Sequence, residues 1–491
     1  MNVLLISPKV EISIRSLSAP LGILSVATYL NGNGYNVKFI DRTICKCDIE
    51  NVIKDFQPDI IGVSMMSAKT IQDVLKICKT AKAHNIPVAC GGTLSSLLPE
   101  LVLSSGVVDY VVINEGEITM LELIQAISNN LPLSHVDGLA FIENGKIVIN
   151  KARDFSDLAS LPVIDWSLAE PAKYFRAYFG CKKMLYLYAG KGCPNQCTFC
   201  FNKEYHRCTY RKRPIEYVLK EIDYLIRHHG LDGVYFSDEN FLGTKSEMRA
   251  VCEQIKNSGL DFVWGCQTRI NGFAEEDFKY LYDSGCRWIF FGIESGSRER
   301  LSKIKKGIAY DKIAETVSNC YNAGIVVIAA FIVGFPDETE EELRQTAEMA
   351  QKLPFAMRSF NHFFPDPGSE LFLSLINEGR YQLPATLNDL AVIETLGGRI
   401  VKNFSKISTR DLNVVYSYFM ISTLFRKKTS ESAKPFSFAL KMLREQFLDM
   451  ANDGFVMFFK NFVLSAKTFL TYLYYFLFFP GIRKKYGLHR N

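Results

Sequence analysis

The stretch Gly192-Cys193-Pro194-Asn195-Gln196-Cys197-Thr198-Phe199-Cys200-Phe201 decides the fold. Its three cysteines lie within eight residues, in a C-x₃-C-x₂-C spacing. A structural zinc site closes its shell with four Cys or His ligands, and His206 and Cys208 follow near enough to take part. An iron–sulfur cluster held by three thiolates leaves one iron open to a further ligand. The spacing therefore predicts a metal centre, which is either a closed zinc site or a reactive cluster.

The surroundings of the cysteines favour the cluster. The apolar run 184–189 predicts a buried strand, the cysteines lie in the loop that follows it, and a helical segment covers 214–228. In barrel-type α/β folds, the loops at the carboxyl ends of the strands carry the chemistry. A reactive centre fits this place better than a structural zinc ion does.

The cysteine stretch resembles the signature of the radical S-adenosylmethionine (SAM) superfamily, including the aromatic Phe199 directly before the third cysteine. The resemblance implies one 4Fe–4S cluster held by Cys193, Cys197 and Cys200, with SAM bound to the open iron. It also implies a partial (β/α)₆ barrel. The sequence offers six strand-and-loop units for such a barrel between residues 184 and 375.

Polar residues follow several of these predicted strands. By the resemblance, Asp238, Glu239 and Asn240 lie in the loop that binds the SAM ammonium group, and Glu294 matches the ribose region. Arg269 ends another strand, and its guanidinium suits a carboxylate. A charged loop residue is more often simply exposed to solvent, but these residues follow strands just as the cysteines do. We therefore assign them to the SAM site, together with Phe199.

Residues 1–135 alternate short apolar runs with helical patterns, which predicts an α/β domain with a doubly wound parallel sheet. Ligands of such sheets bind beyond the carboxyl ends of the strands. Glycines in these loops would let the backbone approach a bulky ligand, although any one loop read alone is an ordinary tight turn. The candidate binding residues are Leu21, Gly22, Ser64, Met65, Gly91, Gly92, Thr93, Glu115 and Gly116.

The order of these loops resembles the cobalamin-binding, Rossmann-like domain that precedes the barrel in one large radical SAM subclass. The resembling phrases are PLGIL at 20–24, CGG at 90–92 and DYVVINEGE at 109–117. Cobalamin domains that bind cobalt through histidine carry an Asp-x-His-x-x-Gly phrase, which this segment lacks; its only histidines are His84 and His135. Thr93 also stands where the family often has a histidine. The resemblance thus implies cobalamin with no histidine on the cobalt.

The remaining chain divides into a connector at 136–183, the barrel at 184–375 and a helical C-terminal region at 376–491. In the connector, Asn144-Gly145 between apolar runs predicts a hairpin. In the C-terminal region, segment 455–479 is dense in Phe and Tyr and is interrupted by Lys460 and Lys467. Two interpretations stay open: a core helix that covers the barrel, or an interfacial helix that contacts a membrane through 455–485.

The composition, with 48% hydrophobic and 22% charged residues, is that of a globular protein. A net charge of +5 is small for 491 residues and gives no indication of nucleic acid binding. The 13 cysteines, with no signal peptide pattern, suit a reducing cytoplasm. No apolar run reaches the roughly 20 residues of a membrane-spanning helix. We therefore expect a cytoplasmic protein, with peripheral membrane contact as the open alternative.

The resemblance implies an enzyme that reductively cleaves SAM to a 5′-deoxyadenosyl radical, abstracts hydrogen from an unactivated carbon and transfers a methyl group from methylcobalamin. Two alternatives stay open: a cyclase or rearrangement enzyme with the same cofactors, and a non-catalytic cobalamin-binding or redox-sensing module. Methylthio transfer is disfavoured because the chain has no second three-cysteine cluster. The implied partners are a small-molecule, peptide or lipid substrate and an electron donor such as flavodoxin or ferredoxin.

Overall fold

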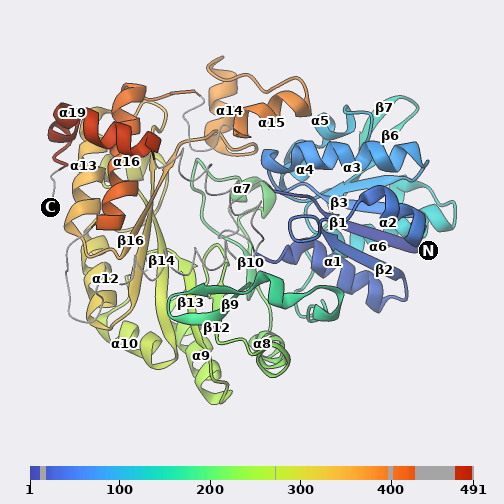
Figure 1. Ribbon diagram of the computed structural model, residues 1–491, viewed down its shortest axis with the longest axis horizontal. Helices are drawn as coiled ribbons and strands as arrows, with labels where there is room; N and C mark the ends of the chain where they lie inside the picture. The colour runs from blue at the N-terminus through green and yellow to red at the C-terminus, as the bar shows by residue number, and fades with distance from the viewer. Residues whose placement is uncertain (11–17, 271, 396–401, 426–469, 489–491) are drawn as a thin grey trace.

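The computed structural model describes the chain apart from residues 11–17, 271, 396–401, 426–469 and 489–491. Two seven-stranded sheets dominate it. In Figure 1 the first sheet, in blue and cyan, lies beside the second, in green to orange, with helix α7 between them. The predicted α/β architecture of two successive domains with a helical C-terminal region is confirmed.

The first sheet has the strand order β2-β1-β3-β4-β5-β6-β7. Strands β1 to β5 are parallel, and the predicted hairpin adds β6 and β7 as antiparallel strands next to β5. The bounds of the strands are β1 (Asn2–Ser7), β2 (Asn36–Asp41), β3 (Ile60–Ser64), β4 (Val88–Gly91), β5 (Tyr110–Val112), β6 (Leu139–Glu143) and β7 (Lys146–Ile149).

Helices cover both faces of this sheet, which explains why its inner strands are nearly continuous apolar runs. Helices α1 and α6 pack together on one face, and the longer α3 lies with α2, α4 and α5 on the other. Their bounds are α1 (Leu21–Gly32), α2 (Ile49–Phe56), α3 (Ile71–Ala83), α4 (Thr93–Leu97), α5 (Pro99–Leu103) and α6 (Gly116–Ser128).

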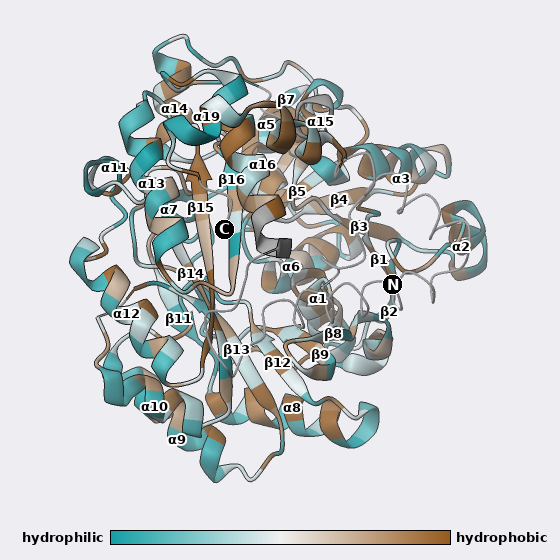
Figure 2. Cartoon of the chain, turned by 60° about the vertical axis from the view of Figure 1, so that its left-hand side comes forward, coloured by the Kyte–Doolittle hydropathy of each residue, from teal (hydrophilic) through white to brown (hydrophobic). Residues whose placement is uncertain are grey.

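The second sheet is the predicted partial barrel of six parallel strands, with β8 added as an antiparallel edge. Figure 2 shows the apolar β14 and β15 behind helices that are hydrophilic on their outer sides. The bounds are β8 (Arg176–Tyr178), β9 (Cys181–Leu187), β12 (Gly233–Phe236), β13 (Val263–Thr268), β14 (Cys286–Glu294), β15 (Val326–Val333) and β16 (Met357–His362).

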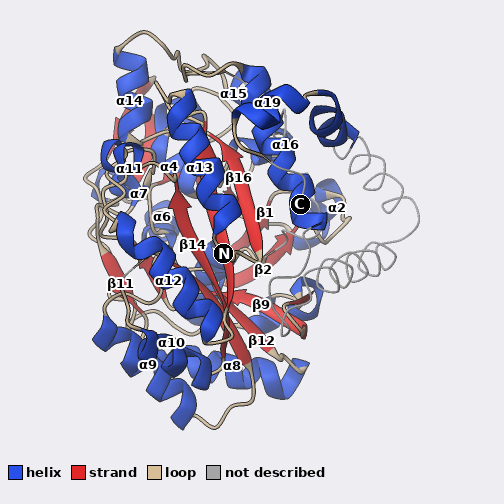
Figure 3. Cartoon of the chain, turned by 90° about the vertical axis from the view of Figure 1, so that its left-hand side faces the viewer, coloured by secondary structure: helices blue, strands red, loops and turns tan. Residues whose placement is uncertain are grey.

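Helices cover the outer face of the barrel, as Figure 3 shows for α12 and α13. Several begin at a side-chain cap; Thr244 and Glu247, for example, form a capping box at α9. The bounds are α8 (Ile215–His229), α9 (Lys245–Asn257), α10 (Glu275–Asp283), α11 (Arg298–Lys303), α12 (Tyr310–Asn322) and α13 (Glu340–Lys352), with the short α7 (Asn202–Tyr205) after the cysteine loop.

Aromatic side chains fill the barrel near the amino ends of its strands. Gly265 faces Trp288, and a Cβ at Gly265 would collide with the indole ring. Phe179, in the turn between β8 and β9, stacks on the Trp288 ring with 4.8 Å between the centroids. The functional loops therefore gather at the opposite end, where the strands finish.

Helices of the C-terminal region contact both domains. Leu387, Leu390 and Ala391 of α15 (Leu387–Thr395) join the core of the first domain. Phe419 of α16 (Thr409–Phe425) stacks on Phe360 of β16 with 4.2 Å between the ring centroids. Among the described residues, the region also includes α14 (Glu370–Asn377) and α19 (Pro480–Lys485).

Of the aromatic segment 455–479, only residues from 470 onward are described, so Lys460 and Lys467 lie outside the described residues. Residues 470–478 are helical, and Phe476 stacks on Tyr418 of α16. The opposite side of this helix is exposed to solvent through Leu470, Tyr474, Leu477 and Phe478. Within the described part of the chain, every helix is too short or too polar to cross a bilayer.

Candidate functional site

A short ribbon carries the chain from the barrel into the cysteine loop. Its strands are β10 (Gly190–Gly192) and β11 (Tyr210–Lys212), which pair antiparallel. Gly192 has a φ of +89°, and a Cβ here would lie too close to the carbonyl oxygen of Thr209. Only glycine combines this conformation with such an approach. Gly192 therefore sets the direction in which the loop leaves the ribbon.

The loop brings the three cysteines together at the carboxyl end of the barrel. Cys193 and Cys197 are each 8% exposed, and Cys200 is half-buried. Burial, with a smaller contribution from the other two thiols, raises the pKa of Cys200 to about 12. Backbone hydrogen bonds tie Thr198 to the carbonyl of Ile304 (3.0 Å) and to the amide of Leu371 (2.8 Å). The loop is thus anchored on two later segments of the barrel.

The zinc alternative finds no support in this geometry. Among the described residues, no three His, Cys, Asp or Glu side chains converge as ligands of a single metal ion. A cluster places its thiolates on separate irons and needs no such convergence. His206 packs instead against the rings of Phe155 and Tyr205, with centroid distances of 6.1 and 4.7 Å.

Several buried polar atoms in and near the cysteine loop have no hydrogen-bond partner among the described residues, including the Thr198 hydroxyl. Two of these atoms belong to charged residues of the predicted SAM site: Nη2 of Arg269, which follows β13, and Oδ1 of Asp238, which follows β12. The other end of the Arg269 guanidinium donates from Nη1 to Sγ of Cys197 at 3.3 Å. Because an unsatisfied buried polar group is costly, these atoms indicate a charged ligand beside the cysteines. They fit an anionic cluster and SAM.

The three predicted ammonium-binding residues differ in what they contact. Asp238 is buried, its Oδ2 accepts a hydrogen bond from the Ala189 amide at 3.0 Å, and burial raises its pKa to about 7. Asn240 is held by the hydroxyl of Thr268 at 3.1 Å. Glu239 accepts from the Gly192 amide at 3.1 Å, yet its side chain is 41% exposed. Of these residues, Glu239 has the most room to meet a ligand ammonium group.

Glu294 lies at the end of β14 in the left-handed region, with a φ of +69°. This conformation is uncommon for a residue other than glycine, and a register shift between Gly292 and Glu294 accompanies it. The side chain is buried and forms an ion pair with Lys306, with 2.8 Å between Oε1 and Nζ. The same Nζ lies 5.9 Å from the centre of the Phe199 ring.

Lys306 was not predicted as a site residue, although it links two residues that were. Sequence reasoning missed it because a lysine beside another lysine is typical of a solvated surface. The available signal was the glycine that follows it, Gly307, which has a φ of +65° and adjoins Nη2 of Arg269. Lys306 therefore belongs to the same group of buried charges as Arg269 and Glu294.

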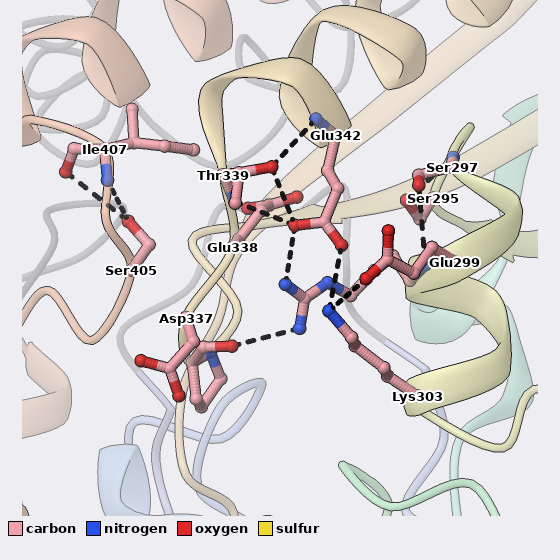
Figure 4. Close-up of polar contacts among 12 residues, drawn as sticks. Ser295, Ser297, Glu299, Lys303, Asp337, Glu338, Thr339, Glu342, Ser405 and Ile407 are labelled. Atoms are coloured by element: carbon pink, nitrogen blue, oxygen red, sulfur yellow. Dashed lines mark hydrogen bonds and ion pairs between the residues drawn. The ribbon is translucent and has the colours of Figure 1, made fainter.

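The loop after β15 adds a buried polar network, shown in Figure 4. Glu342 accepts hydrogen bonds from Thr339 and forms a buried ion pair with Arg300 at 2.8 Å. Glu338 accepts from the Gly334 amide at 2.5 Å, while burial raises its pKa to about 7. This network holds Phe335 edge-on against Phe199, with 5.8 Å between the centroids.

In the first domain, the structure brings together the predicted cobalamin loops that follow β3 and β4. Gly92 has a φ of +101°, and a Cβ there would lie 3.0 Å from the carbonyl oxygen of Met65. Thr93 is buried and Ser64 is half-buried. The neighbouring Met66 is 57% exposed, so a large apolar side chain is available to a bulky ligand at this edge. Gly91 lies beside Val112 with ordinary clearance.

Two other predicted cobalamin loops lie at the boundary with the barrel. Leu21 packs against the core of the barrel, and a Cβ at Gly22 would meet no atom within 4 Å. Gly116 instead packs closely on Val26. Glu115 is occupied by an ion pair with Arg211 of the barrel, at 2.6 Å. The structure therefore gives Glu115 a contact between domains.

Neither histidine of the first domain lies at these loops. His84 ends α3 and contacts Glu50 at 2.9 Å, and His135 is exposed beyond α6. That no histidine of this domain reaches the cobalt stays a prediction.

Comparison with known proteins matches both domains. The model of the radical SAM superfamily covers residues 187–350, and that of the B12 binding domain covers residues 10–124. The chain is 31% identical over 385 residues to an uncharacterized methyltransferase of Pyrococcus horikoshii, covering 76% of this chain and 82% of that one. It is 25% identical to an anaerobic magnesium-protoporphyrin IX monomethyl ester cyclase of Rubrivivax gelatinosus, covering 72% and 66%.

A solved structure shares the fold. It is the radical SAM methyltransferase TsrM of Kitasatospora setae, with cobalamin and a [4Fe-4S] cluster bound, at a TM-score of 0.65 and 18% identity, covering 77% of this chain and 75% of that one. The two family matches and the relative at 31% identity establish more than the fold. The chain belongs to the radical SAM superfamily and, within it, to the cobalamin-dependent enzymes that use a 4Fe–4S cluster and SAM.

Proposed function

We propose that the protein methylates an unactivated carbon of its substrate. The observation that carries this proposal is the meeting of two sites at one boundary. Tyr205, which follows the cysteine loop, hydrogen-bonds Asn114 in both directions, at 2.7 and 3.3 Å, and also contacts Thr93. The predicted cluster loop therefore contacts the predicted cobalamin loops. A reaction that uses both cofactors requires this proximity.

When bound, the cluster with SAM supplies a carbon-centred radical, and cobalamin supplies the methyl group. The chain's own residues hold and orient these groups. Cys193, Cys197 and Cys200 would hold the cluster, and the guanidinium of Arg269 would offset its negative charge while its free Nη2 meets the SAM carboxylate. Because Arg269 is buried, the charge of its guanidinium is little screened by water.

The ribose side of the SAM site would be formed by Glu294. Its ion pair with Lys306 leaves Oε2 for a ribose hydroxyl, and the left-handed backbone turns the side chain back over the end of β14. Phe199 and Phe335 form an aromatic wall beside this pair. Water is largely excluded from the group, because Glu294, Lys306 and Phe335 are all buried.

The proposal is tested by anaerobic reconstitution with iron, sulfide and cobalamin, followed by reduction in the presence of SAM. Formation of 5′-deoxyadenosine would establish catalysis and exclude the purely cobalamin-binding or redox-sensing alternative. A fully loaded protein that leaves SAM intact with every reductant would contradict the proposal. Flavodoxin, ferredoxin and dithionite should be compared, because we propose a small protein electron donor.

A ring-forming or rearranging enzyme is the second candidate. Its support is the similarity to a relative named as an anaerobic magnesium-protoporphyrin IX monomethyl ester cyclase. Such an enzyme would consume SAM without adding a carbon to the product. The substrate class we propose is a small molecule, peptide or lipid.

We also propose a cytoplasmic location with peripheral membrane contact through the helix at 470–478. The support is its exposed apolar side, in which Tyr474 is 51% and Phe478 is 68% exposed, with the exposed Lys484 nearby in the chain. Aromatic and basic side chains together are typical of interfacial helices. Full-length protein should bind vesicles of anionic lipid at low salt, and Y474S/F478S should abolish this binding. Equal binding by the variant would contradict the proposal.

A further inference from the structure

The ribbon that leads into the cysteine loop carries two like charges directly opposite each other. Lys191 of β10 is the cross-strand partner of Arg211 of β11. Like charges in this position destabilise an antiparallel pair. Both side chains are poorly accessible, at 17% and 18% exposure, so water screens the repulsion only weakly. Each strand of the ribbon has only three residues, so the backbone pairing that opposes this repulsion is short.

Carboxylates of the other domain neutralise both charges. Glu115 forms two hydrogen bonds with the Arg211 guanidinium, at 2.6 and 3.0 Å, and lies 3.5 Å from Nζ of Lys191. Glu117 lies 3.2 Å from the same Nζ and also accepts a hydrogen bond from Ser25 at 2.7 Å. Burial acts to raise the pKa of Glu115, but the two cations outweigh it, so the net pKa is lowered.

These contacts lie next to the cluster ligands along the chain. Lys191 precedes Cys193 by two residues, and Gly192 between them has the positive φ that directs the loop. The backbone amide of Gly192 is in turn held by Glu239. The connector also contacts the ribbon, since the Arg211 guanidinium stacks on Phe155 at 4.4 Å and donates to the carbonyl of Ser156 at 2.8 Å. A shift of the ribbon would therefore move the first cysteine.

We infer that Glu115 and Glu117 are positioning residues of the cluster loop, supplied by the cobalamin domain. The ribbon keeps its geometry only while the two carboxylates are docked on Lys191 and Arg211. The cluster site is thus built by both domains. This inference rests on the proposed cluster at Cys193, Cys197 and Cys200, and it replaces the sequence-based assignment of Glu115 as a cobalamin contact.

The test uses the full chain and the variants E115Q and E117Q, with E50Q as the matched control. Glu50 belongs to the same domain but pairs with His84 and Lys54, far from the ribbon in the sequence. Two readouts are needed: hydrogen exchange of the amides at 190–192 and 210–212, and iron bound per chain after reconstitution. We expect exchange at the ribbon to accelerate at least about tenfold in E115Q and E117Q, since breaking a buried pair leaves a charge uncompensated. Iron content should fall with it, and E50Q should match the wild type.

A rescue separates this inference from general misfolding. The double variant K191M/E117Q removes the repulsion along with the carboxylate, so it should regain the slow exchange and the iron that E117Q loses. Retention of cobalamin should be the same in all variants. Wild-type exchange in E115Q and E117Q, or no rescue by K191M/E117Q, would overturn the inference. If the wild type itself binds no iron, the proposed cluster fails, whereas the exchange data still decide the role of the two carboxylates.

Discussion

Nζ of Lys306 lies 2.8 Å from Oε1 of Glu294, and both residues are buried. Removing one partner of a buried ion pair leaves the other charge without compensation. We predict that K306M weakens SAM binding to the reconstituted protein at least about tenfold, measured by equilibrium dialysis with radiolabelled SAM. K306R should retain most of the affinity.

The neighbouring lysine provides the control for this prediction. Lys305 forms an exposed ion pair with Glu370, and exposed pairs contribute little. K305M should therefore bind SAM as the wild type does. Equal affinities of K306M and K305M would show that the buried pair has no role in the SAM site.

Gly192 gives a prediction about the cysteine loop. G192A should lower the iron content and the thermal midpoint for two reasons. The new Cβ would collide with the Thr209 carbonyl, and an alanine would have to adopt a positive φ. The matched control is G34A, which has a similar φ of +84° but open space around it. G34A should show only the conformational cost of about 1–2 kcal/mol. The idea fails if both variants load iron equally.

Glu338 should make stability depend on pH. Burial raises the pKa of Glu338 from 4.5 to about 7 in the folded state, and the nearby Glu342 adds to the rise. The amides of Gly334 and Phe335 and the charge of Arg300 lower the pKa, but burial outweighs them. The folded state therefore binds more protons than the unfolded state between about pH 4.5 and 7, so stability falls as pH rises through this window. The shift corresponds to roughly 3 kcal/mol.

The variant E338Q removes this titration. Its thermal midpoint should change less between pH 5 and 8 than that of the wild type. E340Q is a suitable control, because Glu340 is exposed and pairs with Lys485 at the surface. An unchanged pH profile in E338Q would show that Glu338 keeps an ordinary pKa.

The cobalt environment can be examined by electron paramagnetic resonance of the cob(II)alamin form. Since His84 and His135 both lie away from the predicted cobalamin loops, we predict a spectrum without nitrogen superhyperfine splitting from an axial imidazole. H84A and H135A should give the same spectrum as the wild type. Imidazole splitting that disappears in one of these variants would contradict the prediction.

The sequence predicts those parts of the molecule that depend on residues close together in the chain. The parallel strands follow from the alternation of apolar runs and helical patterns, and the cysteine loop follows from a spacing of eight residues. The role of Glu115 could not be predicted, because Arg211 lies 96 residues away and their contact depends on how two domains dock. The packing of α15 on the first domain could not be predicted for the same reason, because Gln72 contacts Asn388, which lies 316 residues later in the sequence.

Lys306 illustrates a different limit. A lysine in a polar segment predicts solvent exposure on average, and only the folded barrel reveals that Glu294 and Phe199 surround it. Asp238 and Asn240 each commit one oxygen to the protein, to the Ala189 amide and the Thr268 hydroxyl. Their contact with SAM stays a prediction, which the unpaired Oδ1 of Asp238 supports. Strand-end position identifies the right edge of the barrel, and it does not say which side chains at that edge face the ligand.

The cluster itself is tested by replacing each cysteine. C193A, C197A and C200A should each lose the brown chromophore and the reductive cleavage of SAM together, because three thiolates are the whole protein ligand set of the proposed centre. C208A is the control, since Cys208 lies in the turn before β11 and outside the proposed ligand set. A triple variant that still cleaves SAM would end this assignment.

Transfer of a labelled methyl group tests the proposed methylation most directly. Reconstituted protein, reduced anaerobically with cobalamin and methyl-labelled SAM, is incubated with candidate substrates, and the products are analysed by mass spectrometry with C197A as the blank. We expect a product that carries one labelled methyl group on carbon, formed together with 5′-deoxyadenosine. A product that forms with 5′-deoxyadenosine but without label would contradict methylation and establish the cyclase or rearrangement alternative.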